Sequence, residues 1–190
     1  MTAHEIYLIR HTAVDVPLGT CYGRSDVPLA PEHAEDIERV REKLPPAMRV
    51  VTSPSLRCTT LANALTVGAT PPGIDPRLRE LDFGAWELQR WNDIGRDEID
   101  EWRRDIERHA PPGGEPYCEL ARRAVRCLLE SIEAHATPLF LVTHGGVVRA
   151  LLAHALGIEL TQALRLQIDY GGVSKVTYHR EHSVVAYVNR

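Results

Sequence analysis

Three short, mostly apolar segments, each followed at once by polar residues, constrain the fold of this chain more than any other feature. They are residues 5–10 (Glu-Ile-Tyr-Leu-Ile-Arg), 48–53 and 138–143 (Pro-Leu-Phe-Leu-Val-Thr). Apolar runs of this length are typical of strands that are buried on both faces of a parallel sheet. The segments between them have helical patterns, most clearly residues 117–135, where apolar residues recur at helical spacing. Strands that alternate with helices predict an α/β fold of three α/β/α layers with a mostly parallel central sheet.

Proline, glycine and serine residues set the limits of the other predicted elements. Pro45-Pro46 ends a charged helix over 31–44, and Ser53 is the expected N-cap of a helix over 54–67. The remaining expected elements are a loop at 12–30, an extended or irregular segment at 74–86 and a polar helix at 87–108 that carries Trp91 and Trp102 on a charged surface. A helix at 145–156 and two or three strands in 164–190, with a turn at 171–172, complete the expected elements. No internal repeat or linker interrupts the chain, so we expect a single domain over residues 1–190.

The charge and the cysteine content argue against several classes of protein. With 22 Lys and Arg against 26 Asp and Glu, the formal net charge is −4, and the sequence has no basic stripe of the kind that binds DNA or RNA. The apolar part of the first segment, residues 6–9, is too short for a secretory signal or a membrane span. The four cysteines are scattered without a CxxC pair, which argues against a zinc site or a disulfide framework. We therefore expect a cytoplasmic protein without nucleic-acid or membrane partners, and we leave its oligomeric state, a homodimer included, open.

Residues able to bind an anion follow each of the three buried strands. Arg10 and His11 end the first strand, Arg57 lies one helical turn after the second, and His144 and Gly145 follow the third. Because ligands of open parallel sheets bind at the carboxyl ends of the strands, we expect these residues to meet at one edge of the sheet. Two imidazoles, two guanidiniums and the free N–H groups at the start of a helix suit a phosphate dianion.

Taken singly, each of these residues also has an ordinary structural interpretation. A histidine at a strand end is by default a hydrogen-bonded structural residue, and Arg57 alone would be a cation on a helix surface. The dipeptide Arg108-His109 repeats Arg10-His11, but it lies in a polar segment before a Pro-Gly break, so we expect it on the surface. The position at the end of a buried strand, rather than the dipeptide itself, supports the prediction of a site.

Four motifs, in order along nearly the whole chain, resemble those of the histidine phosphatase superfamily, whose members share a phosphoglycerate-mutase-like fold. Residues 8–12 (Leu-Ile-Arg-His-Thr) resemble the opening motif, in which the histidine becomes phosphorylated, and residues 53–58 (Ser-Pro-Ser-Leu-Arg-Cys) resemble the second phosphate-arginine motif. Residues 78–87 resemble the segment with the family's proton donor, which maps to Glu80, and residues 142–149 (Val-Thr-His-Gly-Gly-Val-Val-Arg) resemble the last motif. The sequence departs from the common pattern at four positions. Thr12 and Leu88 stand where Gly is usual, Ser55 stands where Leu is usual, and Cys58 stands where Ala is usual.

One further stretch is similar to a narrower branch of the family. Residues 20–29 (Thr-Cys-Tyr-Gly-Arg-Ser-Asp-Val-Pro-Leu) resemble the segment after the catalytic histidine in α-ribazole phosphatases of cobalamin synthesis. The residues expected to shape the pocket for the rest of the substrate are Tyr22, Gly23, Arg24 and Trp86. Packing roles for Tyr22 and Trp86 are equally compatible with the sequence.

The resemblance implies a phosphatase that forms a phosphohistidine at His11. Glu80 would protonate the leaving oxygen, with Glu87 as the competing acid. The groups that would bind the phosphoryl oxygens are Arg10, His11, Arg57, His144 and the N–H group of Gly145. No metal or cofactor is required, since the arginines supply the positive charge. The implied partner is a small phosphomonoester, and the narrower branch implies α-ribazole 5′-phosphate.

Three other functions stay open. A mutase would return the phosphoryl group of the same phosphohistidine to a second hydroxyl, but this chain is short and lacks the insertions of the glycolytic mutases. A broad-specificity sugar or nucleotide phosphatase would carry the same motifs. A non-catalytic phosphoryl-binding protein is disfavoured, because the four reactive positions keep side chains able to do the chemistry. These positions are His11, Arg57, Glu80 and His144.

Overall fold

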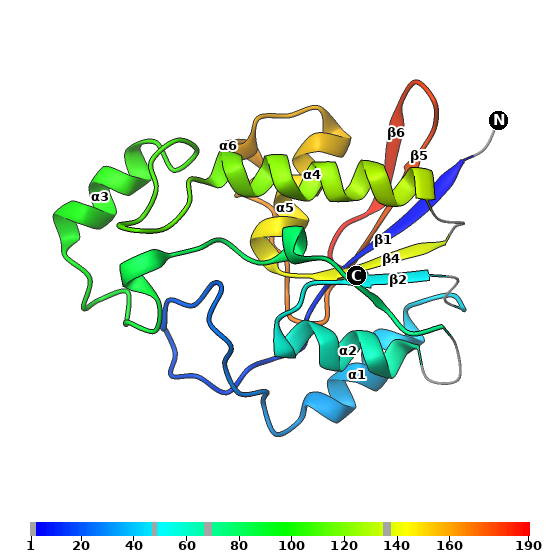
Figure 1. The fold of residues 1–190 in the computed structure, drawn as a ribbon, viewed down its shortest axis with the longest axis horizontal. Helices are drawn as coiled ribbons and strands as arrows, with labels where there is room; N and C mark the ends of the chain where they lie inside the picture. Colours follow the sequence, from blue (N-terminus) through cyan, green and yellow to red (C-terminus); the bar gives the residue numbers. More distant parts are fainter. Residues whose placement is uncertain (1–2, 47–48, 67–69, 135–137) are drawn as a thin grey trace.

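A parallel core with an antiparallel extension makes up the central sheet (Figure 1). The computed structural model describes residues 3–46, 49–66, 70–134 and 138–190. The strands in these ranges are β1 (His4–Arg10), β2 (Arg49–Thr52), β3 (Gly73–Ile74), β4 (Leu139–Thr143), β5 (Val173–Tyr178) and β6 (Ser183–Tyr187). They lie in the order β3-β2-β4-β1-β5-β6, in which the first four are parallel and the last two are antiparallel to their neighbours. The predicted α/β fold with a mostly parallel sheet is confirmed.

Helices cover both faces of the sheet. The helices are α1 (His33–Glu42), α2 (Leu56–Leu65), α3 (Arg96–Arg104), α4 (Tyr117–Ala134), α5 (Gly145–Leu156) and α6 (Leu160–Ala163). In Figure 1, α4 and α5 lie on one side of the sheet and α1 and α2 on the other. Ile6 and Leu8 of β1 pack with α4 and α5, whereas Tyr7 and Ile9 pack with α1 and α2. None of the helices in the described ranges is both long and apolar enough to cross a membrane.

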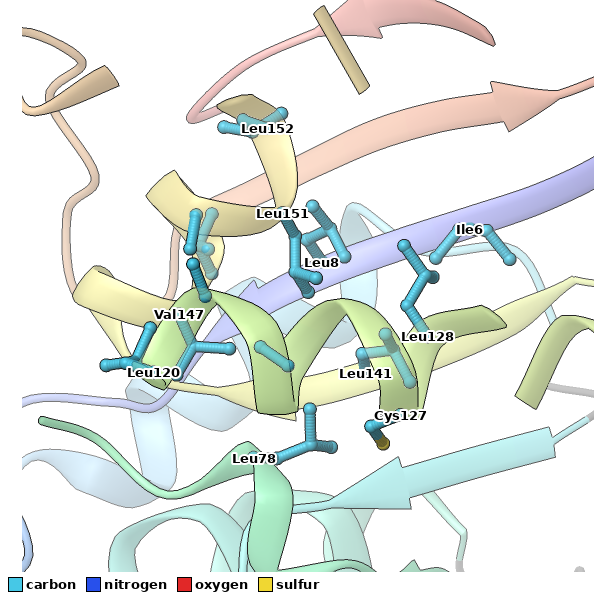
Figure 2. Close-up of a cluster of buried hydrophobic side chains, with 14 of the residues drawn as sticks. Ile6, Leu8, Leu78, Leu120, Cys127, Leu128, Leu141, Val147, Leu151 and Leu152 are labelled. Atoms are coloured by element: carbon cyan, nitrogen blue, oxygen red, sulfur yellow. The ribbon is translucent and has the colours of Figure 1, made fainter. Parts of the chain in front are cut away.

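Large aliphatic side chains fill the space between α4, α5 and the sheet (Figure 2). Leu120 and Leu128 of α4 and Leu151 of α5 are fully buried, as are Leu8 and Leu141 of the two central strands. Burial of one such side chain contributes about 1.5–3 kcal/mol. This layer therefore holds β1 and β4 firmly in place, and with them the residues at their carboxyl ends.

The predicted helix over 87–108 is much shorter in the structure, where only Arg96–Arg104 form α3. The backbone before it is bound to an earlier loop instead, since the N–H of Trp91 donates to the carbonyl of Gly19 at 2.9 Å. Leu88 has a φ of 66°, in the left-handed region that a helix cannot include. Tertiary contacts with the loop thus replace the helical hydrogen bonds that the polar sequence suggests.

The other predicted boundaries differ from the structure in small ways. Ser55 rather than Ser53 directly precedes α2, and the hydroxyl oxygen of Ser53 lies 2.9 Å from Nε2 of His144. Residues 74–86 contain two single turns of 3-10 helix, and the tail forms two strands after the turn at 171–172. α6 has no counterpart among the predicted elements, and β3 lies at the start of the segment expected to be extended or irregular. The predicted limits that lie outside the described residues are the strand start at Met48, the helix end at Val67 and the last residue of the helix over 117–135.

Candidate active site

The carboxyl ends of β1 and β4 lie side by side and bring two histidines together. In the register of the sheet, Arg10 is opposite Thr143. The pairing continues one residue further, since the N–H of His11 donates to the carbonyl of Thr143 at 2.9 Å. The ring centroids of His11 and His144 are 5.2 Å apart. The sheet itself therefore places the two imidazoles in contact, as expected from the strand ends.

His11 is buried and held in one tautomer. Its Nδ1 lies 2.8 Å from the carbonyl oxygen of Thr12, which can only accept, so Nδ1 carries the proton and Nε2 keeps its lone pair. Burial, and then the charges of Arg57 and Arg10, lower the pKa of His11 well below its ordinary value. The ring is therefore neutral at neutral pH, with a free Nε2 that can act as a nucleophile.

His144 is fully buried and contacts three polar neighbours. The Nε–H of Arg57 donates to Nδ1 at 3.3 Å, and the hydroxyl oxygen of Ser53 lies 2.9 Å from Nε2. Because Nδ1 accepts, the neutral ring carries its proton on Nε2 and donates it to Ser53. Burial, and then the charges of His11 and the arginines, lower the pKa of His144 as well. The Sγ of Cys58 lies 3.5 Å from the same Nε2, so Ser53 and Cys58 together fix the ring.

Backbone carbonyl groups orient the guanidinium of Arg57. Its Nη1 donates to the carbonyl of Ser25 at 2.8 Å, and its Nη2 donates to the carbonyl of Gly23 at 2.5 Å. Position 23 must be glycine, because a Cβ there would overlap the carbonyl oxygen of Leu81. Gly23, predicted to shape the substrate pocket, thus acts through its backbone on Arg57 and does not line the cavity described below.

A pair of tyrosines covers the two arginines. The centre of the Tyr170 ring lies 3.9 Å from the guanidinium carbon of Arg10, and that of Tyr22 lies 5.3 Å from the guanidinium carbon of Arg57. The two hydroxyl groups are 2.5 Å apart and form a hydrogen bond. Nη1 of Arg10 donates to the carbonyl of Ile168 at 2.6 Å, while its buried Nε has no hydrogen-bond partner within the described part of the chain. No motif marks Tyr170, which lies in the turn before β5, and the sequence did not indicate it.

Glu80 is held beside the histidines by the first turn of α5. Its Oε2 accepts a hydrogen bond from the N–H of Gly146 at 2.9 Å, and its Oε1 accepts one from the N–H of Leu81 at 3.0 Å. A Cβ at position 146 would overlap Oε1 of Glu80, so the second glycine of the Gly145-Gly146 pair makes this approach possible. The carboxyl group is thereby placed by the same helix start that follows His144.

Glu87, the competing acid, is engaged elsewhere. Its carboxylate accepts hydrogen bonds from the N–H groups of Gly23 at 3.0 Å, Arg24 at 2.9 Å and Phe83 at 3.1 Å. Burial raises the pKa of Glu87, but these hydrogen bonds outweigh it and hold the pKa below its ordinary value. Glu87 therefore stays ionised and ties the loop at 23–24 to the segment at 83–87.

A cavity of about 410 Å³ joins these groups. Its polar end, which we call the phosphate end, is lined by Arg10, His11, Arg57 and His144, with Glu80, Tyr117, Gly146, Arg149, Tyr22 and Tyr170 beside them. The apolar remainder, which we call the aromatic arm, is lined by Phe83, Trp91, Trp102, Ile106 and Leu164. Leu81 and Thr20 complete the lining. All five predicted catalytic residues therefore line the same cavity.

Arg24 and Gly145 lie next to this cavity without lining it. Arg24 forms ion pairs with Asp82 at 3.0 Å and with Glu115 at 3.2 Å, and these two carboxylates occupy its guanidinium. Arg24, predicted to help shape the substrate pocket, is thus held by these carboxylates and does not line the cavity. Gly145 begins α5, but Gly146 is the glycine of this pair that lines the cavity.

Trp86 also lies outside the cavity and has the packing role that the sequence leaves open beside the pocket role. It is 3% exposed, its indole N–H donates to Glu98 at 3.2 Å, and its ring packs behind Trp91 and Trp102. Trp91 and Trp102, expected on a charged surface, line the cavity instead. All three tryptophans of the chain lie between residues 86 and 102, a concentration that could have indicated an aromatic pocket.

Comparison with known proteins identifies one matching family and relatives that cover most of the chain. A model of the histidine phosphatase superfamily (branch 1) matches residues 6–190. A Klebsiella pneumoniae protein described as a probable phosphoglycerate mutase is 30% identical over 93% of this chain and 86% of its own length. The adenosylcobalamin/alpha-ribazole phosphatase of Escherichia coli is 24% identical over 97% of this chain and 95% of its own length. The alpha-ribazole phosphatase of Shigella flexneri has the same fold, with a TM-score of 0.88 at 24% identity, and the match covers 98% of this chain and 96% of that one.

Proposed function

The chain belongs to the histidine phosphatase superfamily (branch 1), and from that premise we propose that it hydrolyses a phosphomonoester through a phosphohistidine at His11. The observation that carries this proposal is the meeting of a neutral imidazole with a free Nε2, two guanidiniums and a carboxyl group around one cavity. Uncatalysed phosphomonoester hydrolysis is so slow that accelerations up to about 10²¹ are needed. A nucleophile, positive charge and a proton donor must all be supplied, and the cavity holds a group for each.

In the first step, Nε2 of His11 attacks phosphorus while the bond between phosphorus and the ester oxygen breaks. Nδ1 keeps its proton and its hydrogen bond to the carbonyl of Thr12, which stabilises the positive charge that develops on the ring. Glu80, protonated at this stage, gives its proton to the leaving oxygen, so that the product departs as a neutral alcohol. The groups assigned to the nonbridging oxygens are Arg10 and Arg57, together with His144 once its Nε2–H turns from Ser53 to the phosphoryl group.

In the second step, water replaces the histidine on phosphorus. Glu80, now a carboxylate, takes a proton from the water molecule as its oxygen bonds to phosphorus. The bond between phosphorus and nitrogen breaks, and its electron pair returns to Nε2 of His11. Inorganic phosphate leaves, and both His11 and Glu80 regain their starting protonation states.

For the substrate we propose α-ribazole 5′-phosphate, and with it a role in assembling the nucleotide loop of cobalamin. The support is the resemblance of residues 20–29 to α-ribazole phosphatases, together with the Escherichia coli relative of that name. Tyr22 of this stretch lines the cavity. The test is a phosphate-release screen of α-ribazole 5′-phosphate against sugar and nucleotide monophosphates. Preference for the latter would favour a broad-specificity phosphatase.

A mutase is the second candidate, favoured by the relative described as a probable phosphoglycerate mutase. A mutase would transfer the phosphoryl group from His11 to a second hydroxyl rather than to water. Incubation with 3-phosphoglycerate and 2,3-bisphosphoglycerate separates the two activities. Formation of 2-phosphoglycerate would support the mutase, and release of inorganic phosphate without it would support hydrolysis.

The phosphohistidine mechanism itself is tested by substitution of His11. Replacement of an enzyme's nucleophile typically costs about 10⁵–10⁶ in kcat, and we expect a loss of this order for His11→Ala with any phosphomonoester substrate. His109→Ala is the matched control, because His109 also follows an arginine but is exposed and lies outside the cavity. Activity that survives in His11→Ala, or that is lost equally in His109→Ala, would contradict the mechanism.

A further inference from the structure

We propose that the aromatic arm is the binding subsite for the alcohol part of the substrate, and that it takes a planar, uncharged aromatic group. This inference rests on the proposed phosphomonoester hydrolysis, since it concerns the part of the substrate that lies beyond the phosphoryl group. It names a class of substrate and does not depend on α-ribazole being the one used.

Three aromatic side chains form the wall of the arm. The ring centroid of Phe83 lies 5.5 Å from that of Trp91 and 6.1 Å from that of Trp102, and the two indoles are stacked at 6.1 Å with an angle of 20° between their planes. All three side chains are only partly buried, so they present apolar surface to the cavity. Ile106 and Leu164 complete this apolar lining.

The charged residues of the cavity all belong to the phosphate end. Arg10 ends β1, Arg57 lies in the first turn of α2 after β2, and Glu80 is held by the first turn of α5. Arg149 also lies here, because its Nη1 and the Nε of Arg10 are 3.4 and 3.5 Å from the position of a Cβ on Gly145. Among the described residues, none of the cation–ring contacts involves Phe83, Trp91 or Trp102. A charged group in the arm would lose its hydration without gaining a partner, which is costly.

The arm is held in shape by contacts behind it. The ring of Trp86 packs against Trp91 and Trp102, with centroids 6.3 and 5.6 Å away, and its indole N–H is bound by Glu98. The backbone N–H of Trp91 donates to the carbonyl of Gly19 at 2.9 Å. The arm therefore exists before a ligand enters, and little ordering opposes binding.

The size of the cavity fits an aromatic group attached to a phosphoryl group. Its volume of about 410 Å³ is within the range of small-molecule sites. A short alcohol such as serine or glycerate would stay beside the phosphate end and gain nothing from the three rings. An aromatic alcohol would bury its ring against them, which corresponds to about a 10–100-fold gain in kcat/KM.

The experiment compares two primary alkyl esters, 2-phenylethyl phosphate and ethyl phosphate, on the same enzyme preparation. We expect kcat/KM to be about 10–100-fold higher for the phenylethyl ester. Trp91→Leu and Trp102→Leu should each reduce this ratio severalfold. Tyr187→Leu is the control, since Tyr187 is a partly buried aromatic residue of β6 that does not line the cavity, and it should leave the ratio at the wild-type value. Because the ratio is taken within one preparation, it does not depend on how much of a variant is folded.

Inhibition of the wild-type enzyme by two phosphonates gives a second test that needs no variants. 3-Phenylpropylphosphonate and propylphosphonate mimic the two esters but cannot be hydrolysed, and we expect the former to inhibit more strongly by a similar factor. Equal turnover of the two esters and equal inhibition would overturn the aromatic subsite and leave the hydrolysis intact. A preference that Trp91→Leu and Trp102→Leu both leave unchanged would also overturn it. Failure of the wild type to hydrolyse either ester or any other phosphomonoester would instead overturn the proposed function.

Discussion

The two ends of the cavity are built from different kinds of structure. At the phosphate end, His11, Arg57 and His144 are at most 2% exposed and follow directly from strands or lie in the first turn of a helix. The aromatic arm is carried mainly by residues 83–106, in which α3 is the longest regular element, and its three rings are partly exposed. The sheet therefore fixes the groups that react, while a segment outside the sheet supplies the surface that selects the alcohol.

This difference implies that the two ends respond differently to change. Substitutions at the phosphate end should alter the chemical step, its dependence on the leaving group and its dependence on pH. Substitutions in the arm should alter the choice between substrates. The predictions that follow test the phosphate end, from the largest expected effect to the smallest, and the arm variants serve as their contrast.

Glu80→Gln should produce the largest of these effects. Loss of a general acid costs about 10²–10⁴ in rate, and we expect kcat/KM for an alkyl phosphate to fall by this much. The loss should be much smaller for 4-nitrophenyl phosphate, whose phenolate leaves without a proton. Equal losses for the two substrates would show that Glu80 is not the proton donor.

Gly146→Ala should mimic part of this effect without touching the carboxyl group. The added methyl group overlaps Oε1 of Glu80 and must displace it. Small displacements of catalytic groups cost about 10–100-fold, and the loss in kcat/KM should again be greater for the alkyl ester than for 4-nitrophenyl phosphate. Gly145→Ala, whose methyl group would be 3.4 Å or more from its neighbours, should cost less. The reverse order of the two variants would contradict the role given to Gly146.

The buried histidines should make the stability of the chain depend on pH. The pKa values of His11 and His144 lie well below 6.5 in the folded chain, mainly because of burial. In the unfolded chain they return to about 6.5, so below that pH the unfolded state binds more protons, and the free energy of unfolding falls by up to about 1.4 kcal/mol per pH unit for each histidine. Urea denaturation between pH 7 and pH 5 measures this slope.

A comparison of variants isolates the contribution of one histidine to that slope. His144→Gln should make the decrease of the unfolding free energy between pH 7 and pH 5 less steep, whereas Trp91→Leu should not change it. The same slope in wild type and in His144→Gln would mean that the imidazole of His144 is not held in its neutral form by the fold.

Tyr170→Phe should have the smallest effect. It removes the hydroxyl bridge to Tyr22 but keeps the ring over Arg10. One neutral hydrogen bond near the surface is worth about a 2–5-fold change, and we expect KM and the inhibition constant of inorganic phosphate to rise by this factor. Tyr170→Ala should raise both further, because the contact of the ring with Arg10 is also lost. Equal values for wild type and Tyr170→Ala would contradict a role of the tyrosine pair at the phosphate end.

The same contrast explains what the sequence could predict. His11 and His144 could be placed because each follows an apolar run that is long enough to be a buried strand, and parallel strands bring their carboxyl ends to one edge. The sequence around Glu80 has no such regular element, and its assignment depended on family resemblance. The link between Glu80 and Gly146 is a long-range contact that no local pattern encodes.

The aromatic arm could not be predicted for a related reason. Trp91 is positioned by a hydrogen bond to Gly19, far away in the chain, and Trp102 is positioned by its packing against Trp86 and Phe83. The polar helical pattern over 87–108 does not encode these contacts. It predicts one long helix, whereas tertiary packing leaves only α3 helical. The sequence leaves a pocket role and a packing role open for Trp86. Its burial and its hydrogen bond to Glu98 place it behind Trp91 and Trp102, outside the cavity.

The most direct test of the account is the location of the phosphoryl group during turnover. The Glu80→Gln variant should form the intermediate from 4-nitrophenyl phosphate and hydrolyse it slowly, so quenching in base and mass spectrometry should find one phosphoryl group on His11. Because Nδ1 is bound to the carbonyl of Thr12, ³¹P NMR should place that group on Nε2. A phosphoryl group on another residue or on Nδ1 of His11, or an unmodified chain during turnover, would contradict the account.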